Sequence, residues 1–290
     1  MIVACAPPTV DAALRVATSR LEAAGVDAPR IQATALLGHA LQVDRAALLA
    51  SLSDTVDPET ASTFERLIEL RCARHPLQYL IGRASFLDFE VRVRPGVFIP
   101  RPETEQLAEQ ALRLWSPSHP WVIDVGTGSG AVAIALARGS TRCRVLAIDR
   151  SPTALASAAA SAIDNGVEQQ ISFVRSDLLS AVRSCPPNNG IGLLVSNPPY
   201  VRADDVVQPE VRDHEPVAAW AAGPLGTEIY ARLIPQAAER LDTLRPMLLE
   251  LGYDQAEAVT ELLQRDGRWL NCRIDPDFQN IPRVLTVLRR

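Results

Sequence analysis

The tetrapeptide Asn197-Pro198-Pro199-Tyr200 combines residue types that could hold a planar amino group. It follows an apolar run at 191–195, which predicts a buried strand. Neither proline can donate a hydrogen bond to a neighbouring strand, so the sheet should stop here. Asn197 is therefore expected at the carboxyl end of a strand, where open α/β sheets bind their ligands.

The tetrapeptide offers two hydrogen-bond acceptors and one flat surface. Asn197 has a side-chain carbonyl oxygen, and Pro198 has a backbone carbonyl without an N–H of its own. These two oxygens could accept both N–H bonds of an NH2 group while the ring of Tyr200 packs against its plane. A rigid turn without a ligand would suit the same four residues, so this pattern does not decide alone.

A second candidate site is the stretch Asp124-Val125-Gly126-Thr127-Gly128-Ser129-Gly130, between a predicted strand and a predicted helix. Gly126 and Gly128 permit positive φ angles and close approach of a ligand to the backbone. With Ala131 in the last place, the spacing satisfies the dinucleotide pattern G-x-G-x-x-G/A. The loop therefore fits NAD and S-adenosylmethionine equally well, and a tight turn without a ligand would have the same pattern.

Two acidic residues follow the next two predicted strands. Asp149 ends the first of these, where its carboxylate could accept both hydroxyls of a ribose, and Asp177 follows the other, beside the expected adenine edge. Together with the glycine loop they predict a site for an adenosine-containing ligand. A hydride-transfer site has no evident need for a clamp on an NH2 group, whereas a methyl donor does. The tetrapeptide therefore favours S-adenosylmethionine over NAD.

Strand–helix alternation from Trp121 onward predicts a mainly parallel sheet with helices on both faces. The expected strands are 121–125, 144–149, 171–175, 191–196, 247–251, 269–274 and 284–288. The helices between them should begin near Ser129, Pro152, Asp177, Thr227 and Gln255. Residues 201–226 interrupt this rhythm with three prolines and predict a long loop over the site.

Residues 9 to about 82 carry helical patterns throughout. N-caps are expected at Thr9, Asp44 and Asp57, and Gly25 should end the first helix. The second helix has an apolar run made of Ile31, Ala35, Leu36, His39, Ala40 and Leu41. The prediction is a small helical bundle without a catalytic constellation, which could recognise a partner or form a structural cap.

Residues 84–100 change to an alternating pattern, with a turn predicted at Pro95-Gly96 and a second strand at 97–99. This β-hairpin would connect the helical bundle to the α/β domain. Pro102 then starts a helix that should run to about Trp115.

Composition argues against several classes of protein, only weakly so for nucleic-acid binders. The 290 residues are 47% hydrophobic and carry a formal net charge of −5, with a pI of about 5.5, whereas nucleic-acid binders usually show a basic excess. No secretory signal or membrane-spanning stretch is evident. The cysteines are scattered, which favours reduced thiols, and the histidines are equally dispersed, so no metal site is expected. The cysteines are Cys5, Cys72, Cys143, Cys185 and Cys272.

Nearly the whole chain resembles the bacterial release factor glutamine methyltransferases, also called protein-(glutamine-N5) methyltransferases. The likeness extends over the Asp124–Gly130 loop, Ser176-Asp177, Ser196–Tyr200, Pro76-Leu77-Gln78-Tyr79-Leu80-Ile81-Gly82 and Phe98-Ile99-Pro100-Arg101-Pro102-Glu103-Thr104-Glu105. The tetrapeptide alone also occurs in DNA adenine methyltransferases. The proline-arginine-proline-acid segment and the helical front domain are more specific to the release factor enzymes.

The resemblance implies a Rossmann-like methyltransferase domain at 101–290, a release-factor-recognition domain at 1–82 and a hairpin linker at 83–100. S-Adenosyl-L-methionine would be held by Gly126, Thr127, Gly128, Ser129, Gly130, Asp149, Asp177, Leu178 and Asn197. Asn197, Pro198 and Tyr200 would be catalytic, and with Pro199 they would hold the glutamine of a release factor's Gly-Gly-Gln loop. The product would be S-adenosyl-L-homocysteine. We expect a monomeric cytoplasmic enzyme whose partners are class 1 peptide chain release factors, with no direct nucleic-acid or membrane partner.

The sequence departs from the family's pattern at three places. Gln32 stands where an acid is common, Asn280-Ile281-Pro282 replaces a more usual glycine-containing stretch, and Leu178 is often aromatic elsewhere. Only the last could alter adenine packing. Two other functions remain open at this stage: a nucleic-acid adenine methyltransferase, because adenine also presents a planar NH2 group, and a non-catalytic adenosyl-ligand sensor or scaffold.

Overall fold

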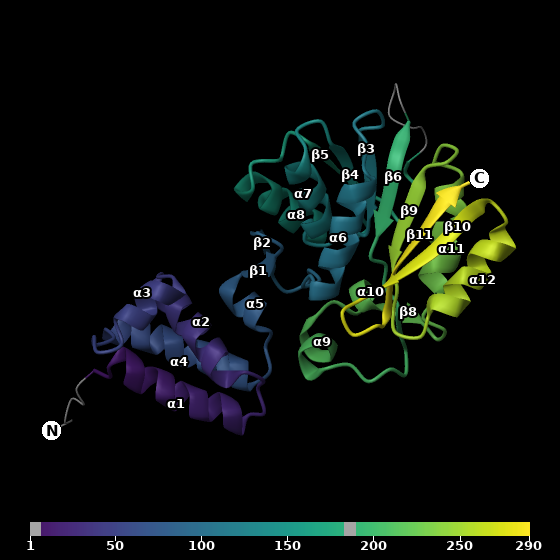
Figure 1. Ribbon diagram of the computed structural model, residues 1–290. Helices are drawn as coiled ribbons and strands as arrows, with labels where there is room; N and C mark the ends of the chain where they lie inside the picture. The colour runs from purple at the N-terminus through teal and green to yellow at the C-terminus, as the bar shows by residue number, and fades with distance from the viewer. Residues whose placement is uncertain (1–6, 183–189) are drawn as a thin grey trace. The chain divides into compact units, whose positions relative to one another are not determined.

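The structure is a computed structural model that describes residues 7–182 and 190–290, which form two compact units (Figure 1). The first unit comprises the chain up to Gly82 together with Gln208–His214, and the second comprises Arg83–Val207 and Glu215–Arg290. Each has a hydrophobic cluster of its own. Cys5 and Cys185, two of the five expected free thiols, lie outside the described residues.

Within residues 7–82 the first unit contains five short-to-medium helices, and the later segment adds a sixth. They are α1 (Val10–Ala23), α2 (Pro29–Leu41), α3 (Arg45–Ala50), α4 (Pro58–Cys72), α5 (Leu77–Ile81) and α9 (Pro209–His214). The side chains of Thr9, Asp44 and Asp57 accept hydrogen bonds from the first turns of α1, α3 and α4, which confirms the three predicted N-caps. Gly25 follows α1 with a φ of 68°, as the predicted helix end requires.

The buried face of α2 differs from the predicted one. Of the predicted run, Leu36 is fully buried, whereas Ile31 is 60% exposed and His39 is exposed. Ala33 and Leu37, which lie outside that run, are fully buried. Because α2 packs against α1, α3, α4 and α5, its buried face is wider than a single stripe. Its apolar residues surround the helix almost evenly, so periodicity could not define the correct face.

The α9 segment is held in the first unit by two arginines. Arg71 and Arg74 reach the two carboxylate oxygens of Glu210, at 2.8 and 2.9 Å. Burial opposes ionisation of Glu210, but the hydrogen bonds from these arginines outweigh it and lower its pKa. Gln32 Oε1 accepts a further hydrogen bond from Arg71 Nε at 2.6 Å. A neutral side chain therefore suffices at Gln32, since Glu210 already pairs the charge of Arg71.

The region 201–226 is thus not the long irregular loop that the sequence predicts. Besides α9 it contains β7 (Val201–Arg202), α10 (Val217–Trp220) and β8 (Ala221–Gly223), and β7 pairs with β8 in a small sheet of its own. These elements are too short to give a periodic pattern, and prolines mark only their ends.

The predicted hairpin is shorter than expected. The chain does turn at Pro95-Gly96 as predicted, but this turn does not join the two strands of the hairpin. Strands β1 (Arg83–Phe86) and β2 (Phe89–Arg92) pair around Leu87, whose φ is 50°, while the Pro95-Gly96 turn and residues 97–99 lie outside the sheet. The hairpin packs on helix α8 (Pro152–Asp164): Ser161 Oγ accepts from the Arg92 backbone N–H at 2.8 Å.

The main sheet of the second unit has seven strands in the order β10-β11-β9-β6-β3-β4-β5. Strands β3 (Trp121–Val125), β4 (Arg144–Asp149), β5 (Ile171–Arg175), β6 (Ile191–Ser196) and β9 (Pro246–Glu250) are parallel, and β10 (Trp269–Pro276) and β11 (Pro282–Arg289) form an antiparallel edge. This confirms the predicted mainly parallel sheet.

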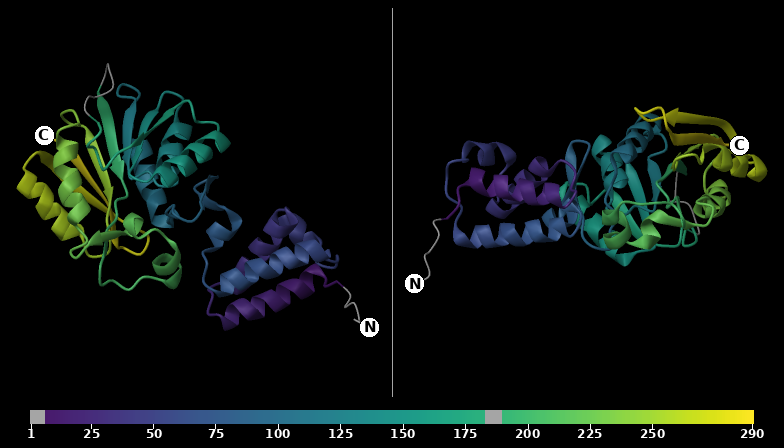
Figure 2. Two further views of the ribbon diagram at one scale, coloured as in Figure 1. Left: turned by 180° about the vertical axis from the view of Figure 1, so that it is seen from behind. Right: turned by 90° about the horizontal axis from the view of Figure 1, so that it is seen from below.

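Helices cover both faces of this sheet (Figures 1 and 2). On β3, Ile123 and Val125 pack into the cluster that contains residues of α11 (Glu228–Ala238) and α12 (Ala256–Asp266). Because neighbouring strand residues point to opposite faces, Val122 and Asp124 face the other layer. That layer contains α6 (Pro102–Leu114), α7 (Ala131–Gly139) and α8.

The predicted helix near Asp177 is absent over 177–182, where the chain forms turns. In the part of the chain that the structure describes, no helix is both long enough and apolar enough to cross a membrane.

Candidate active site

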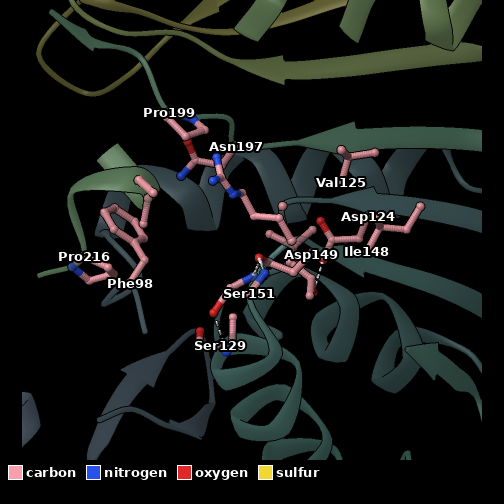
Figure 3. Close-up of a pocket in the computed structure, with 18 of the residues that line it drawn as sticks. Phe98, Asp124, Val125, Ser129, Ile148, Asp149, Ser151, Asn197, Pro199 and Pro216 are labelled. Atoms are coloured by element: carbon pink, nitrogen blue, oxygen red, sulfur yellow. Dashed lines mark hydrogen bonds between the residues drawn. The ribbon is translucent and has the colours of Figure 1, made fainter. Parts of the chain in front are cut away.

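A cavity in the second unit opens at the carboxyl ends of β3, β4 and β6 (Figure 3). Its wall includes Asp124 from β3, Asp149 from β4 and Asn197 directly after β6. Figure 3 shows Phe98 beside Pro216 on one side of the cavity. The topology thus brings together two predicted sites, at 124–130 and at 197–200, because parallel strand ends meet at one edge of a sheet.

The glycine loop follows β3 in a conformation that only glycine adopts without strain. Gly126, Gly128 and Gly130 have φ angles of 76°, 57° and 85°. The N–H groups of Gly126 and Thr127 donate to the Ile148 carbonyl at 2.8 and 2.9 Å, which ties the loop to β4. Gly126, Thr127, Gly128 and Ser129 line the cavity.

Gly130 is not among the lining residues; its position is set by helix packing. A Cβ atom there would lie 3.0 Å from the Cβ of Ala158 on α8. The absence of a side chain at Gly130 therefore allows the start of α7 and α8 to approach each other.

We expect Gly130→Ala to destabilise the protein more than Gly166→Ala. Both glycines have positive φ, which costs an alanine about 1–2 kcal/mol. A Cβ at Gly166 meets nothing within 4 Å, whereas one at Gly130 adds overpacking of about 1–3 kcal/mol. Urea unfolding of both variants measures the difference, and equal losses of stability would contradict the packing argument.

Asp149 links the glycine loop to the start of α8. Its two carboxylate oxygens accept hydrogen bonds from the backbone N–H groups of Gly128 and Ser151, at 3.0 and 2.9 Å. Burial raises its pKa, and these backbone hydrogen bonds oppose the rise. Each oxygen has a further lone pair, so the carboxylate can still accept hydroxyl groups of a ligand in the cavity.

Asp124 is a second acidic group in the same cavity wall; it begins the predicted loop, but no ligand contact was predicted for it. It is 2% exposed, and burial raises its pKa to about 7, with a further contribution from the Asp149 charge. Thr127 Oγ1 donates to Asp124 Oδ2 at 2.7 Å and opposes the rise. The sequence does contain a sign of its importance: Asp124 is an acid within an otherwise apolar strand, two positions before Gly126.

Asp177 and Leu178 also line the cavity. Asp177 forms an ion pair with Arg232 on α11. Leu178 adopts a φ of 50° and packs against the core. A left-handed conformation is unfavourable for leucine. At Leu178 this conformation forms part of a turn in the wall of the cavity.

The four residues of the tetrapeptide divide into two groups. Asn197 and Pro199 line the cavity (Figure 3). Pro198 is buried and Tyr200 packs against the core; neither is among the lining residues. Asn197 Nδ2 donates to Thr104 Oγ1 at 3.0 Å, and the Tyr200 hydroxyl donates to Glu250 Oε1 at 3.3 Å.

Glu250 is a fully buried acid at the end of β9 and was not predicted as part of the site. Burial raises its pKa to about 7, while hydrogen bonds from Thr104 and Tyr200 and the charge of Arg283 act in the opposite direction. A single glutamate closing an otherwise apolar strand was the only sign of it in the sequence.

Comparisons with known proteins identify the family. Residues 12–82 match the family model "PrmC N-terminal domain", and residues 90–214 match "Methyltransferase small domain". The chain is 40% identical over 280 residues to a release factor glutamine methyltransferase of Koribacter versatilis, covering 96% of this chain and 97% of that one. This chain belongs to the release factor glutamine methyltransferase family. A relative from Mycolicibacterium smegmatis with the same name is 37% identical over 278 residues, covering 96% of each chain.

The resemblance found in the sequence is therefore confirmed, and so is the methyltransferase fold. Among solved structures, the 16S rRNA N2 G1207 methyltransferase of T. thermophilus in complex with AdoMet and guanosine matches with a TM-score of 0.50. It is 21% identical, and the match covers 72% of this chain and 50% of that one. At this identity the likeness shows only that the two proteins share a fold, and it says nothing about their substrates.

Proposed function

We propose that this chain methylates N5 of the glutamine in the Gly-Gly-Gln motif of class 1 peptide chain release factors. S-Adenosyl-L-methionine would be the donor and S-adenosyl-L-homocysteine the product. The observation that carries the proposal is the position of Asn197, whose side chain stands in the same cavity wall as the glycine loop and Asp149. The names of the family's members support a release factor as the acceptor.

The residues of the cavity fit this donor. The positive φ angles of Gly126 and Gly128 leave backbone without Cβ atoms on the cavity wall, and Asp149 can accept ribose hydroxyls beside it. Asp124 is buried, Asp149 is half-buried, and burial raises the pKa of both, so a ligand with positive charge would stabilise their ionised forms. Asp177 and Leu178 would border the adenine.

The chain's own contribution to methyl transfer would be alignment and charge stabilisation. An amide nitrogen is a poor nucleophile because its lone pair is delocalised into the carbonyl. When bound, S-adenosylmethionine supplies a methyl group on a positively charged sulfur, which takes back the electron pair of the breaking bond as the nitrogen forms the new one. The Asn197 side-chain oxygen and the Pro198 carbonyl would accept the two N–H bonds, which favours growth of positive charge on nitrogen.

Tyr200 would hold the plane of the amide, with its ring oriented by the hydrogen bond to Glu250. The nitrogen can lose its proton to water after the transfer, so the site needs no strong general base.

The division into a recognition domain at 1–82, a linker at 83–100 and a catalytic domain at 101–290 is also a proposal. It is supported by the match of residues 12–82 to the family's N-terminal model. We further propose that the enzyme acts as a monomer in the cytoplasm, on release factors and not on nucleic acid or membranes.

The deciding experiment offers three acceptors to the purified protein with methyl-labelled S-adenosylmethionine. These are an intact class 1 release factor, the same factor with its Gly-Gly-Gln glutamine replaced by alanine, and DNA. We expect one added methyl group on that glutamine by mass spectrometry and none on the other two. Labelling of DNA with an unmodified release factor would support an adenine methyltransferase, and no transfer to any acceptor would support a sensor.

A further inference from the structure

One wall of the cavity is formed by two segments that are far apart in the sequence. Phe98 and Pro100 precede α6, whereas Pro216 and Ala219 belong to the segment around α10. Figure 3 shows Phe98 beside Pro216. Neither segment belongs to the seven-stranded sheet, so contacts outside the sheet must hold this wall in place.

Glu215 joins the two segments directly before Pro216. Its side chain is 1% exposed. One carboxylate oxygen accepts from the guanidinium of Arg101, and the other accepts from the Ile99 backbone N–H at 3.3 Å. Because Gln208–His214 belongs to the first unit, Glu215 is also the residue at which the chain returns to the second unit. The two contacts therefore fix the start of the returning segment against residues whose neighbours line the cavity.

Arg101 contacts both the buried acid and the cavity wall. Its guanidinium carbon lies 4.8 Å from the centre of the Phe98 ring, a distance typical of cation–π contacts. Its backbone is extended. In the stretch before it, Phe98 and Pro100 line the cavity while Ile99 between them is buried. Arg101 and Glu215 are not among the lining residues, so they are placed to hold the wall without contacting a ligand.

A buried ion pair defines geometry more than it adds stability. Two charges lose their hydration on burial, and their attraction roughly offsets this loss, so apolar residues of similar size stabilise a protein as well. Apolar residues do not supply a fixed direction, because hydrophobic contacts are non-directional whereas charge-assisted hydrogen bonds are not. The pair of Arg101 and Glu215 is therefore suited to positioning.

We infer that Arg101 and Glu215 are positioning residues for the methyl donor, whose ion pair holds Phe98 and Pro216 together as a preformed wall of the donor site. The inference rests on the proposed function and gives the arginine of the proline-arginine-proline-acid segment a part in it. Without the pair, the wall would be displaced in a fraction of the molecules. The apparent Kd for the donor then rises by the inverse of the fraction whose site is formed.

Arg101→Met is the direct test, and Arg138→Met is its matched control. Arg138 makes the same two kinds of contact, an ion pair with Asp88 and a position over the Phe89 ring at 5.1 Å. None of these three residues lines the cavity. We expect Arg101→Met to raise the Kd for S-adenosylmethionine at least about tenfold in calorimetry, and Arg138→Met to leave it unchanged. Arg101→Lys keeps a cation that can donate to Glu215, so it should recover most of the affinity.

Steady-state kinetics with a release factor separates positioning from a role in the chemical step. Saturating donor repopulates the formed site, so Arg101→Met should raise the donor KM and leave kcat within about threefold of the wild-type value. A residue that only stabilises the fold would leave the donor KM of the folded enzyme unchanged. A rise confined to the release factor KM would assign the wall to the acceptor and overturn the inference.

Trp220 at the end of α10 provides a readout without any ligand. Its indole N–H is buried and has no hydrogen-bond partner among the described residues. Release of the segment would expose the indole to water and move its fluorescence emission to longer wavelength. The signal is assigned as the difference between each protein and the same protein carrying Trp220→Phe. We expect the shift in ligand-free Arg101→Met and not in Arg138→Met.

The inference is overturned if Arg101→Met binds S-adenosylmethionine with the wild-type Kd, or if its Trp220 emission is unchanged. If Arg101→Met does not fold because Glu215 is left unpaired, the double variant Arg101→Met with Glu215→Gln replaces it. This variant contains no unpaired charge there, and the glutamine oxygen can still accept from Ile99. It should bind the donor more weakly than Arg138→Met does, and wild-type affinity would likewise overturn the inference. Failure of the wild type to bind S-adenosylmethionine would instead refute the proposed function.

Discussion

Replacement of Asn197 by alanine is expected to lower kcat for glutamine methylation by about 10²–10³, the usual effect of removing one preorganised hydrogen-bonding group from a reacting centre. The Nδ2 group is engaged by Thr104, so the loss falls on the side-chain oxygen that would accept from the substrate amide. Single-turnover rates with a release factor measure the effect. Donor affinity, measured by calorimetry, should change far less.

Asn197→Asp separates the acceptor from the rest of the side chain. It keeps an acceptor oxygen and replaces the NH2 that faces Thr104, so it should retain more activity than Asn197→Ala. A wild-type rate in the alanine variant would show that Asn197 only terminates a strand. Equal inactivity of both variants would point to the Nδ2 contact, not to the acceptor oxygen.

Much of the second unit could be predicted because its strands and turns are determined by residues that are close together in the sequence. Strands β3, β4, β5 and β6 have the predicted bounds, since buried parallel strands are continuous apolar runs between turn residues. The N-caps at Thr9, Asp44 and Asp57 likewise depend on residues within three positions.

Features that depend on tertiary packing were predicted less well. The hairpin turns at Leu87, a leucine with positive φ, and Pro95-Gly96 gave a much stronger turn signal nearby. The docking of Gln208–His214 on the first unit depends on Arg71 and Arg74, more than 130 positions earlier. No local pattern encodes such a contact.

The same distinction applies to the site. The glycine loop and Asp149 were predicted because strand-end positions are visible in the sequence. Thr104 is 93 positions from Asn197, so its hydrogen bond could not be predicted. Asn280 adopts a φ of 60°, a conformation that asparagine tolerates, so the backbone there does not require a glycine.

The affinity for S-adenosylmethionine is expected to rise about tenfold between about pH 6 and pH 8, because Asp124 has a pKa of about 7 in the ligand-free protein. A positively charged ligand favours the ionised carboxylate, and at the lower pH most of the protein holds Asp124 protonated. Binding should therefore release a proton at acidic pH. Calorimetry in buffers of different ionisation enthalpy measures both the affinity and the proton release.

Stability of the free protein should change with pH in the opposite direction. The pKa of Asp124 is raised on folding, so its stabilising contribution is complete at acidic pH and is lost as the pH rises through about 7. Glu250 acts in the same sense. Ligand-free Asp124→Asn should accordingly lose less stability than the wild type between acidic and alkaline pH, as measured by urea unfolding.

Asp124→Asn is also the control for ligand binding, since it keeps the size of the side chain and removes its charge. Asp149, whose pKa is also raised by burial, remains in this variant, so the difference between the two proteins isolates Asp124. We expect the variant to bind S-adenosylmethionine more weakly at alkaline pH and with a flatter pH dependence. An unchanged pH slope in Asp124→Asn would assign the proton to Asp149 or another group, and pH-independent binding in the wild type would show that neither acid responds to the ligand's charge.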